Sequence, residues 1–363
     1  MRVYIIPIFL KTIVFSFLSC IVCFVNQLQA DVVTFGSGAN TFTLNFKTVG
    51  NPGNNADTSW SLPGIGSPGR VNYSYGISEF EITERMIDIY NLHVNANMRI
   101  GYESPGRGPN KPATEITWNE AARFVNWLNE SSGDYAAYKY SGDINANLMP
   151  WDAFDDEFDW NEFNEYRSLR TRFVLPSMNE WYKAAYYDPR LNNGSGGYWK
   201  YSVQTNGIPN AVTSGTGAQD VVYRYNVNGV VGVDGTPADV NNAGGLSAYG
   251  VMAMNGNVWE WLETPESARY GSGLSQRALA GGSWADMFAT NFAKEQVVFY
   301  SPNTSLHQGG FRIVSLLDWG NDNDGGGGVG AFSSVPEPST TAAFLGVTAC
   351  AVMRRLRTLR RKR

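Results

Sequence analysis

The clearest helical pattern in the chain lies between residues 117 and 129. Its apolar residues recur every three or four positions and would share one face of a helix: Ala121, Phe124, Val125 and Leu128. Thr117 precedes them and Glu120 follows three residues later, which is the spacing of a capping box. The pattern therefore predicts an amphipathic helix over 117–129.

Two further helices are expected from similar signals. Pro176 and Ser177 stand at the start of the segment 177–187, and Glu180 completes a second capping box. Thr83 is a suitable N-cap for a shorter helix over 84–91, which would follow a strand within residues 73–83. The chain thus contains well-marked helices, but they are few and far apart.

The rest of the pattern indicates strands and long loops. Apolar residues alternate between 32 and 49, which predicts one or two strands, whereas residues 51–69 are dense in Gly, Pro, Asn and Ser. Residues 189–250 are rich in Gly and Asn and have few periodic runs, so we expect long loops that need a stabilising device. With 13% aromatic residues and 39 glycines, the chain is expected to form a mixed α/β (α+β) domain with little regular secondary structure.

The N-terminal segment 1–30 has the composition of a secretory signal peptide. Arg2 and Lys11 supply positive charge, residues 13–25 are almost wholly apolar, and a cleavage site is expected before Asp31. An uncleaved anchor is the alternative. A lipid attachment at Cys20 is disfavoured because that residue lies inside the apolar run. Residues 31–69 would then form N-terminal strands and a loop ahead of the main domain.

The C-terminal end has three parts in a fixed order. A Gly-rich linker over 316–334 leads to Val335-Pro336-Glu337-Pro338-Ser339 and then to an apolar stretch that ends at Met353. Seven basic residues lie in the segment 354–363 that follows. Cationic residues directly after an apolar stretch keep that end in the cytoplasm. Residues 335–363 resemble the PEP-CTERM sorting tail of Gram-negative bacteria, although an ordinary tail anchor would give the same topology. The resemblance implies an exosortase-type partner, a transient inner-membrane anchor through the apolar helix, and secretion to the cell surface or outer envelope.

Charge and cysteine placement exclude several classes of protein. Residues 1–30 and 354–363 hold nine of the 28 basic residues and no acid, so residues 31–353 hold 19 basic against 33 acidic residues, a net charge of −14. Such a domain is not expected to bind nucleic acid through phosphates. The three cysteines, Cys20, Cys23 and Cys350, all lie in the terminal segments. Residues 31–335 therefore have no disulfide, cysteine nucleophile or thiolate metal site.

The segment 133–172 is predicted to be an insertion. Its acidic residues alternate with aromatic ones, as in Trp151-Asp152-Ala153-Phe154-Asp155. Such a segment could bind calcium or a partner protein. The alternative is a solvated surface lobe whose aromatic side chains pack down onto the domain.

Several short blocks occur in one order along the chain. They are Glu79–Thr83, Ile116–Ala121, Leu175–Trp181, Met254–Trp261, Gly281–Trp284 and Gly310–Ile313. Together they resemble the sulfatase-modifying factor family, whose founding activity is the formylglycine-generating enzyme, over residues 70–315. The resemblance implies the formylglycine-generating enzyme fold, which is distantly similar to C-type lectins. Trp259 and Trp261 would pack a core, and Arg312 would tie loops together.

The family's oxidase chemistry depends on two cysteines shortly after the Gly-Gly-Ser block, which bind copper. The matching positions here are Asp286 and Asn291, and neither supplies a thiolate. Copper(I) prefers sulfur ligands, so copper is not expected to bind. No catalytic residue is assigned, although Ser283 and Trp259 match positions near the family's active site, and a remnant of that pocket could persist around all four residues.

Iron is also disfavoured as a cofactor. Other branches of the family are treated as non-heme iron enzymes and use histidines, usually from an additional domain. This chain has only His93 and His307, far apart in sequence. A site that combines both histidines with Asp286 is the remaining arrangement.

Structural calcium is the metal that the resemblance implies. The first calcium site would use Asn226, the Val227 carbonyl, Asp234 and the Thr236 carbonyl. The second site would use the Gly256 and Val258 carbonyls and the Glu260 carboxylate, while its remaining ligand position falls on Ala253, which has no side-chain oxygen. The alternative is that Asn226 and Glu260 only form hydrogen bonds between loops.

An intact scaffold without thiolates indicates an exported, noncatalytic family member. We expect a surface or matrix protein that binds an extracellular polysaccharide or protein ligand. One alternative is an oxidoreductase that acts on protein side chains by formylglycine-type or non-heme iron chemistry. Another is a partner that binds sulfatases without modifying them.

Overall fold

The structure is a computed structural model that describes residues 31–101, 106–140, 148–149, 151, 155, 166–224, 226–227, 230–231, 235–266 and 276–316. The predicted signal peptide and sorting tail lie outside these residues, as does the predicted linker except for Leu316. Within the described ranges, no helix has the length and apolar character that a membrane span requires.

The chain begins with an antiparallel hairpin. Strand β1 (Asp31–Ser37) pairs along its whole length with β2 (Asn40–Val49), from Asp31↔Phe46 to Ser37↔Asn40. Gly38 has φ +60° in the two-residue turn, a conformation that costs glycine little. The alternation between residues 32 and 49 therefore predicted these strands correctly.

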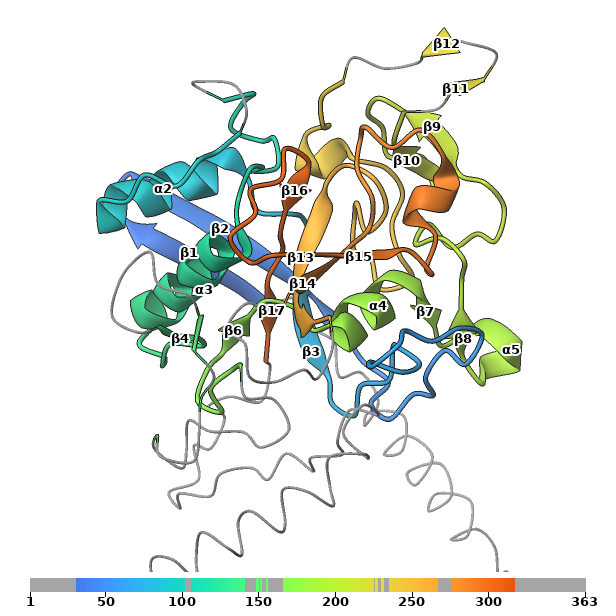
Figure 1. Cartoon of the computed structure of the whole chain (residues 1–363), viewed down its shortest axis with the longest axis horizontal. Coiled ribbons are helices and arrows are strands. Elements are labelled where there is room, and N and C mark those ends of the chain that lie inside the picture. The colour runs from blue at the N-terminus through green and yellow to red at the C-terminus, as the bar shows by residue number, and fades with distance from the viewer. Residues whose placement is uncertain are drawn as a thin grey trace, which may run out of the picture. The chain divides into compact units, whose positions relative to one another are not determined.

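The hairpin is one side of a five-stranded antiparallel sheet with the order β1-β2-β3-β17-β6. Its other strands are β3 (Tyr75–Ser78), β17 (Val314–Ser315) and β6 (Phe173–Val174). The neighbours β3 and β17 come from opposite ends of the described chain. The sheet thus joins the N-terminal and C-terminal parts of the domain, as Figure 1 shows.

A second, four-stranded sheet has the order β15-β14-β13-β16. It consists of β13 (Trp259–Pro265), β14 (Arg277–Ala280), β15 (Val297–Tyr300) and β16 (Gly309–Gly310). The pair β13–β16 is parallel, and the other two pairs are antiparallel. The chain between β14 and β16 carries Ser283, Asp286 and Asn291, which the sequence analysis placed in one candidate pocket.

The three predicted helices are present. They are α2 (Glu84–Val94), α3 (Trp118–Ser132) and α4 (Met178–Tyr186). Thr83 caps α2, and the predicted capping boxes form at Thr117–Glu120 and Ser177–Glu180. Helix α3 ends at Ser132, three residues later than predicted. Gly133 follows it, and its φ of +81° closes the helix.

The remaining elements are short. They are β4 (Lys139–Tyr140), β5 (Leu148–Met149), β7 (Tyr187–Asp188), α5 (Leu191–Gly194), β8 (Gly197–Tyr198), β9 (Asn210–Val212), β10 (Asp220–Val222), β11 (Asn226–Val227), β12 (Val230–Val231) and the 3-10 helices η1 (Val240–Asn242) and η2 (Ala289–Phe292). Most of 189–250 is loop, as its composition predicted. The fold is thus mixed α/β with little regular secondary structure.

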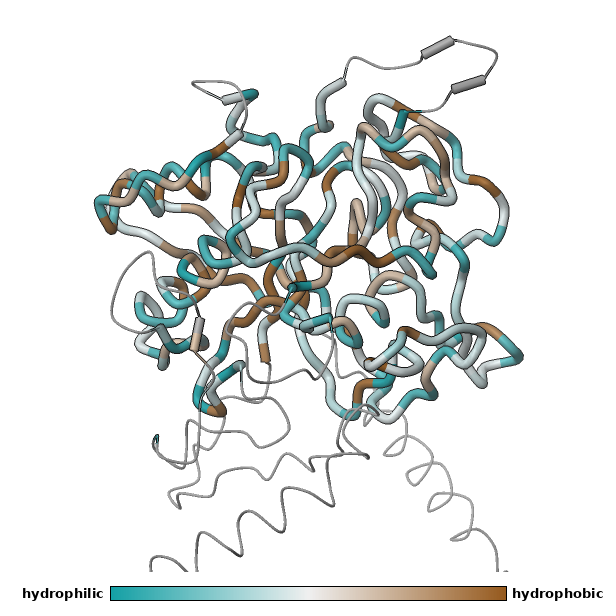
Figure 2. The backbone as a smooth tube through the Cα atoms, viewed as in Figure 1, coloured by the Kyte–Doolittle hydropathy of each residue, from teal (hydrophilic) through white to brown (hydrophobic). Residues whose placement is uncertain are grey.

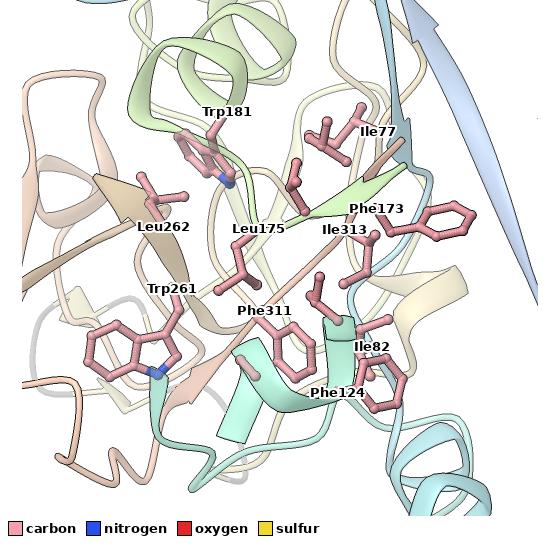
Figure 3. Packing of buried hydrophobic residues seen from close by; sticks show 14 of the residues in the cluster. Ile77, Ile82, Phe124, Phe173, Leu175, Trp181, Trp261, Leu262, Phe311 and Ile313 are labelled. Carbon is pink, nitrogen blue, oxygen red and sulfur yellow. The ribbon is translucent and has the colours of Figure 1, made fainter. Parts of the chain in front are cut away.

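The main core lies where both sheets and the helices meet. Apolar backbone positions concentrate along the central strands in Figure 2, and Figure 3 shows their side chains packed together. Phe124 of α3 packs edge-on against Phe311, with ring centroids 5.6 Å apart. Trp261 is fully buried and donates its indole N–H to the Ile116 carbonyl over 2.8 Å, whereas Trp259 is only half-buried.

Both ends of the segment 133–172 pack into this core. Tyr138 and Arg167 are buried, and the Tyr138 hydroxyl donates to Glu263 over 2.9 Å. Most of the acidic and aromatic residues between them lie outside the described residues. The described flanks of the segment are therefore integral parts of the domain.

Candidate functional site

The candidate site begins at a tight passage directly after β14. Gly281 and Gly282 have φ values of +99° and +75°, and a Cβ at Gly282 would lie 2.5 Å from the Phe292 Cβ. Only glycine allows the chain to pass this close beneath η2. This close packing fixes the backbone that leads into Ser283 and the residues after it.

Asp286 is the centre of a hydrogen-bond network. Its Oδ2 accepts from the Ser283 backbone N–H over 2.6 Å and from the Ser283 hydroxyl over 3.1 Å. Its Oδ1 accepts from Asn291 Nδ2 over 3.1 Å. The structure thus brings together three of the four residues that the sequence placed in a remnant pocket. Ser283 is buried, while Asp286 and Asn291 are partly exposed.

Trp259, the first residue of β13, and Gln308, directly before β16, adjoin this network. The Ser283 hydroxyl lies 3.3 Å from Gln308 Oε1, and the Trp259 backbone N–H donates to the Gln308 carbonyl over 2.9 Å. Gln308 was missed by the sequence reasoning. It lies 25 residues after Ser283 in an irregular segment, and no pattern marks it.

Comparison with known proteins identifies the family. The model of the sulfatase-modifying factor enzyme 1-like domain matches residues 70–317, more than half of the chain. The chain belongs to this family. Among solved structures, Treponema denticola variable protein 1 is 20% identical with a TM-score of 0.50, and the match covers 79% of this chain and 99% of that one. At this identity the likeness shows a shared fold alone.

Two further solved structures match with lower TM-scores. A protein described as CarF is 19% identical with a TM-score of 0.49, over 80% of this chain and 100% of that one. PvdO from Pseudomonas aeruginosa is 14% identical with a TM-score of 0.46, over 78% of this chain and 98% of that one.

The site of this sulfatase-modifying factor domain offers oxygen and nitrogen atoms. Asp286 and Asn291, which the resemblance matched to the cysteine positions, are hydrogen-bonded to each other. Across the described ranges, no group of three or more His, Cys, Asp or Glu side chains is arranged to hold a metal. These residues do not fit copper(I), which prefers sulfur.

The two histidines contact different parts of the domain. His93 lies on α2, where its ring nitrogens are 3.2 Å from the Ser37 hydroxyl and 2.8 Å from the Ile89 carbonyl. His307 packs edge-on against Trp284, with ring centroids 5.6 Å apart. Among the residues that the structure describes, no three side chains of His, Cys, Asp or Glu are grouped to hold a metal, so the two histidines and Asp286 do not form an iron site there.

In the second expected calcium set, the Glu260 carboxylate has protein partners. Arg312 donates to both oxygens of the Glu260 carboxylate, from Nε and from Nη2, each over 2.6 Å. Trp181 Nε1 donates to Glu260 Oε2 over 2.6 Å. Gly256 and Val258 are buried. The Glu260 carboxylate is thus the partner of a buried arginine, and the second calcium set stays a prediction.

The first expected calcium set is described only in part. Asn226 and Val227 form β11, and Thr236 is exposed, but Asp234 lies outside the described residues. Nothing in the described geometry decides whether these residues hold calcium, and this set remains a prediction.

A second buried carboxylate accompanies Glu260. Asn257 Nδ2 donates to the two oxygens of Glu81 over 3.1 and 3.0 Å, and Asn257 Oδ1 accepts from the Ala238 N–H over 2.8 Å. The pKa of Glu81 is raised from 4.5 to about 8, because burial and, second, the Glu260 charge together outweigh the lowering by the Arg312 charge. This cluster holds loops together and faces no solvent.

Proposed function

We propose that the chain is an exported, noncatalytic binding protein of the sulfatase-modifying factor family that acts at the cell surface or in the extracellular matrix. The observation that supports it is the hydrogen bond of 3.1 Å between Asp286 and Asn291. It joins the positions at which the family's oxidase would present two thiolates. No cysteine occurs between residues 31 and 335 to replace them.

The terminal segments support export and sorting. The N-terminal apolar segment and the Pro-Glu-Pro tail with its basic end fit secretion followed by processing through an exosortase-type enzyme. We further propose structural calcium at Asn226, Val227, Asp234 and Thr236, because carboxylate and carbonyl oxygens suit this cation. The ligand of the domain would be an extracellular polysaccharide or protein.

Copper(I) affinity separates this proposal from the oxidase alternative. The full chain, purified in detergent, would be titrated with copper(I) in competition with a chromophoric chelator. We expect the chelator to keep the metal, because Asp286 and Asn291 are poor ligands for a soft ion. One tightly bound copper per chain that is lost in an Asp286→Ala variant would contradict the proposal.

A further inference from the structure

Two large apolar side chains stand exposed beside the Asp286 network. Met287 and Phe288 are 36% and 58% exposed and lie between Asp286 and Asn291. Single exposed apolar residues are common on protein surfaces. Two in succession, within a six-residue loop closed by a side-chain hydrogen bond, combine an apolar surface with polar atoms. Such a combination is typical of a ligand site.

The backbone beneath this loop is held in place without a ligand. Phe292 is buried, and its ring lies 4.7 Å from that of Tyr223 and 5.9 Å from that of Tyr201. Asn255 Nδ2 donates to the Phe292 carbonyl over 2.9 Å, and the Asn291 N–H donates to the Phe288 carbonyl over 2.9 Å. A ligand would therefore meet a preorganised surface, and little loop ordering would oppose its binding.

The polar atoms of the site have hydrogen-bonding capacity left. Within the part of the chain that the structure describes, Asn291 Oδ1 and Gln308 Nε2 have no hydrogen-bond partner, and the Asp286 carboxylate has room for a further donor. The site thus offers acceptors and a donor side by side. Hydroxyl groups both donate and accept, so adjacent hydroxyls on one ligand would satisfy all three residues.

We propose that Asp286, Met287, Phe288, Asn291 and Gln308 form a binding face for a neutral hexose unit of a polysaccharide. A pyranose ring has one face of C–H groups, which would pack on the exposed Phe288 ring, and an edge of hydroxyls, which would bond to the carboxylate and the amides. The only charge in this face is negative, and residues 31–353 carry a net charge of −14. Both features disfavour a uronic acid.

An acidic sugar is the competing ligand. Arg224 adjoins the face, because its backbone N–H donates to the Asp286 carbonyl over 2.9 Å. The inference rests on the proposed binding function, since an oxidase would use the same residues for a peptide. The test therefore includes an acidic glycan and a peptide.

The experiment measures binding of the full chain, purified in detergent, to immobilised cellohexaose, mannohexaose and an alginate hexamer. We expect at least one neutral hexamer to bind and alginate not to bind. Phe288→Ala, which removes a 58% exposed ring and leaves no core cavity, should weaken that binding about tenfold. Tyr135→Ala is the matched control, because its ring is 54% exposed on a different part of the chain.

Several outcomes would overturn this inference. One is an absence of binding to both neutral hexamers, and another is binding that Phe288→Ala and Gln308→Ala leave unchanged. Preferential binding of alginate would assign the face to an acidic ligand instead. If a sulfatase-type peptide binds and its cysteine stays unchanged, the ligand is a peptide and not a sugar, and the proposed binding function still holds. Conversion of that cysteine would refute the proposed function itself.

Discussion

Replacement of Arg312 by methionine is expected to remove the main electrostatic support of the domain interior. The Arg312 side chain is 0% exposed and donates to both oxygens of Glu260. Its other donors reach the Ser78 and Met252 carbonyls, each over 3.0 Å. Arg312→Met would leave two buried carboxylates, Glu260 and Glu81, without a cation.

The expected cost is large compared with the stability of a domain. Breaking a buried ion pair by removing one partner costs about 3–5 kcal/mol, because the remaining charge is uncompensated. Total stabilities are about 5–15 kcal/mol. The variant is therefore expected to lose at least about a fifth of its free energy of unfolding and to melt well below the wild type.

The loss should also depend on pH. The pKa of Glu81 in the folded chain, about 8, lies above 4.5, so between these values the folded chain binds more protons than the unfolded chain. Stability contributed by this group therefore falls as the pH rises through that window and is constant above it. Without Arg312, both carboxylates depend on protonation, so the cost of Arg312→Met should be greater at about pH 8.5 than at about pH 5.

Urea denaturation followed by tryptophan fluorescence would measure both effects. The control is the double variant Glu260→Gln with Arg312→Met, which removes both charges and should recover part of the loss. A cost below about 1 kcal/mol that is the same at both pH values would refute the reasoning. It would mean that Glu260 has another partner in solution, such as the calcium ion that the sequence suggested.

Three further predictions concern stability. Arg167→Met should cost about 3–5 kcal/mol in denaturant unfolding, because Glu180 and Glu263 would remain buried without the guanidinium that lies 2.9–3.0 Å from them. The control is Arg99→Met, which should cost less than about 1 kcal/mol because the Arg99 side chain is 72% exposed. Equal costs for the two variants would contradict the account. Gly282→Ala should lower the Tm by several degrees in calorimetry, since the residue has a φ of +75° and an added Cβ would lie 2.5 Å from the Phe292 Cβ. An unchanged Tm would contradict the close packing of Gly282 against Phe292. EDTA should lower the Tm and added calcium restore it if the first calcium set is occupied, whereas a Tm indifferent to both would exclude it.

The helices could be predicted from the sequence because their signals are local. Thr117 and Glu120 lie three residues apart and both contact the same helix end, so the spacing alone carries the information. The same holds for Ser177 and Glu180. The hairpin followed from alternation over a short stretch, since each strand buries one face.

The buried ion pairs could not be predicted in the same way. Arg167 stands in a segment that composition marked as an insertion, yet it pairs with Glu263, 96 residues later. Glu260 and Arg312 are 52 residues apart, and the resemblance suggested calcium for the former. Pairings of this length leave no periodic trace, because they depend on how the two sheets meet.

The candidate site could be predicted only in part, because it combines local with long-range contacts. Ser283, Asp286 and Asn291 lie in one loop at a spacing that the family motif fixes, so the sequence placed them together. Gln308 joins them only because β16 pairs in parallel with β13. The exposure of Phe288 depends on how η2 is anchored, which no local pattern records.

Mass spectrometry of a cysteine-containing sulfatase peptide tests the central claim most directly. The full chain would be incubated with the peptide, copper and oxygen, beside a thiol-containing member of the family as the positive control. The account predicts that this chain leaves the cysteine unchanged while the control converts it. Conversion to formylglycine by this chain, abolished in an Asp286→Ala variant that still folds, would contradict the account and establish an oxidase without thiolates.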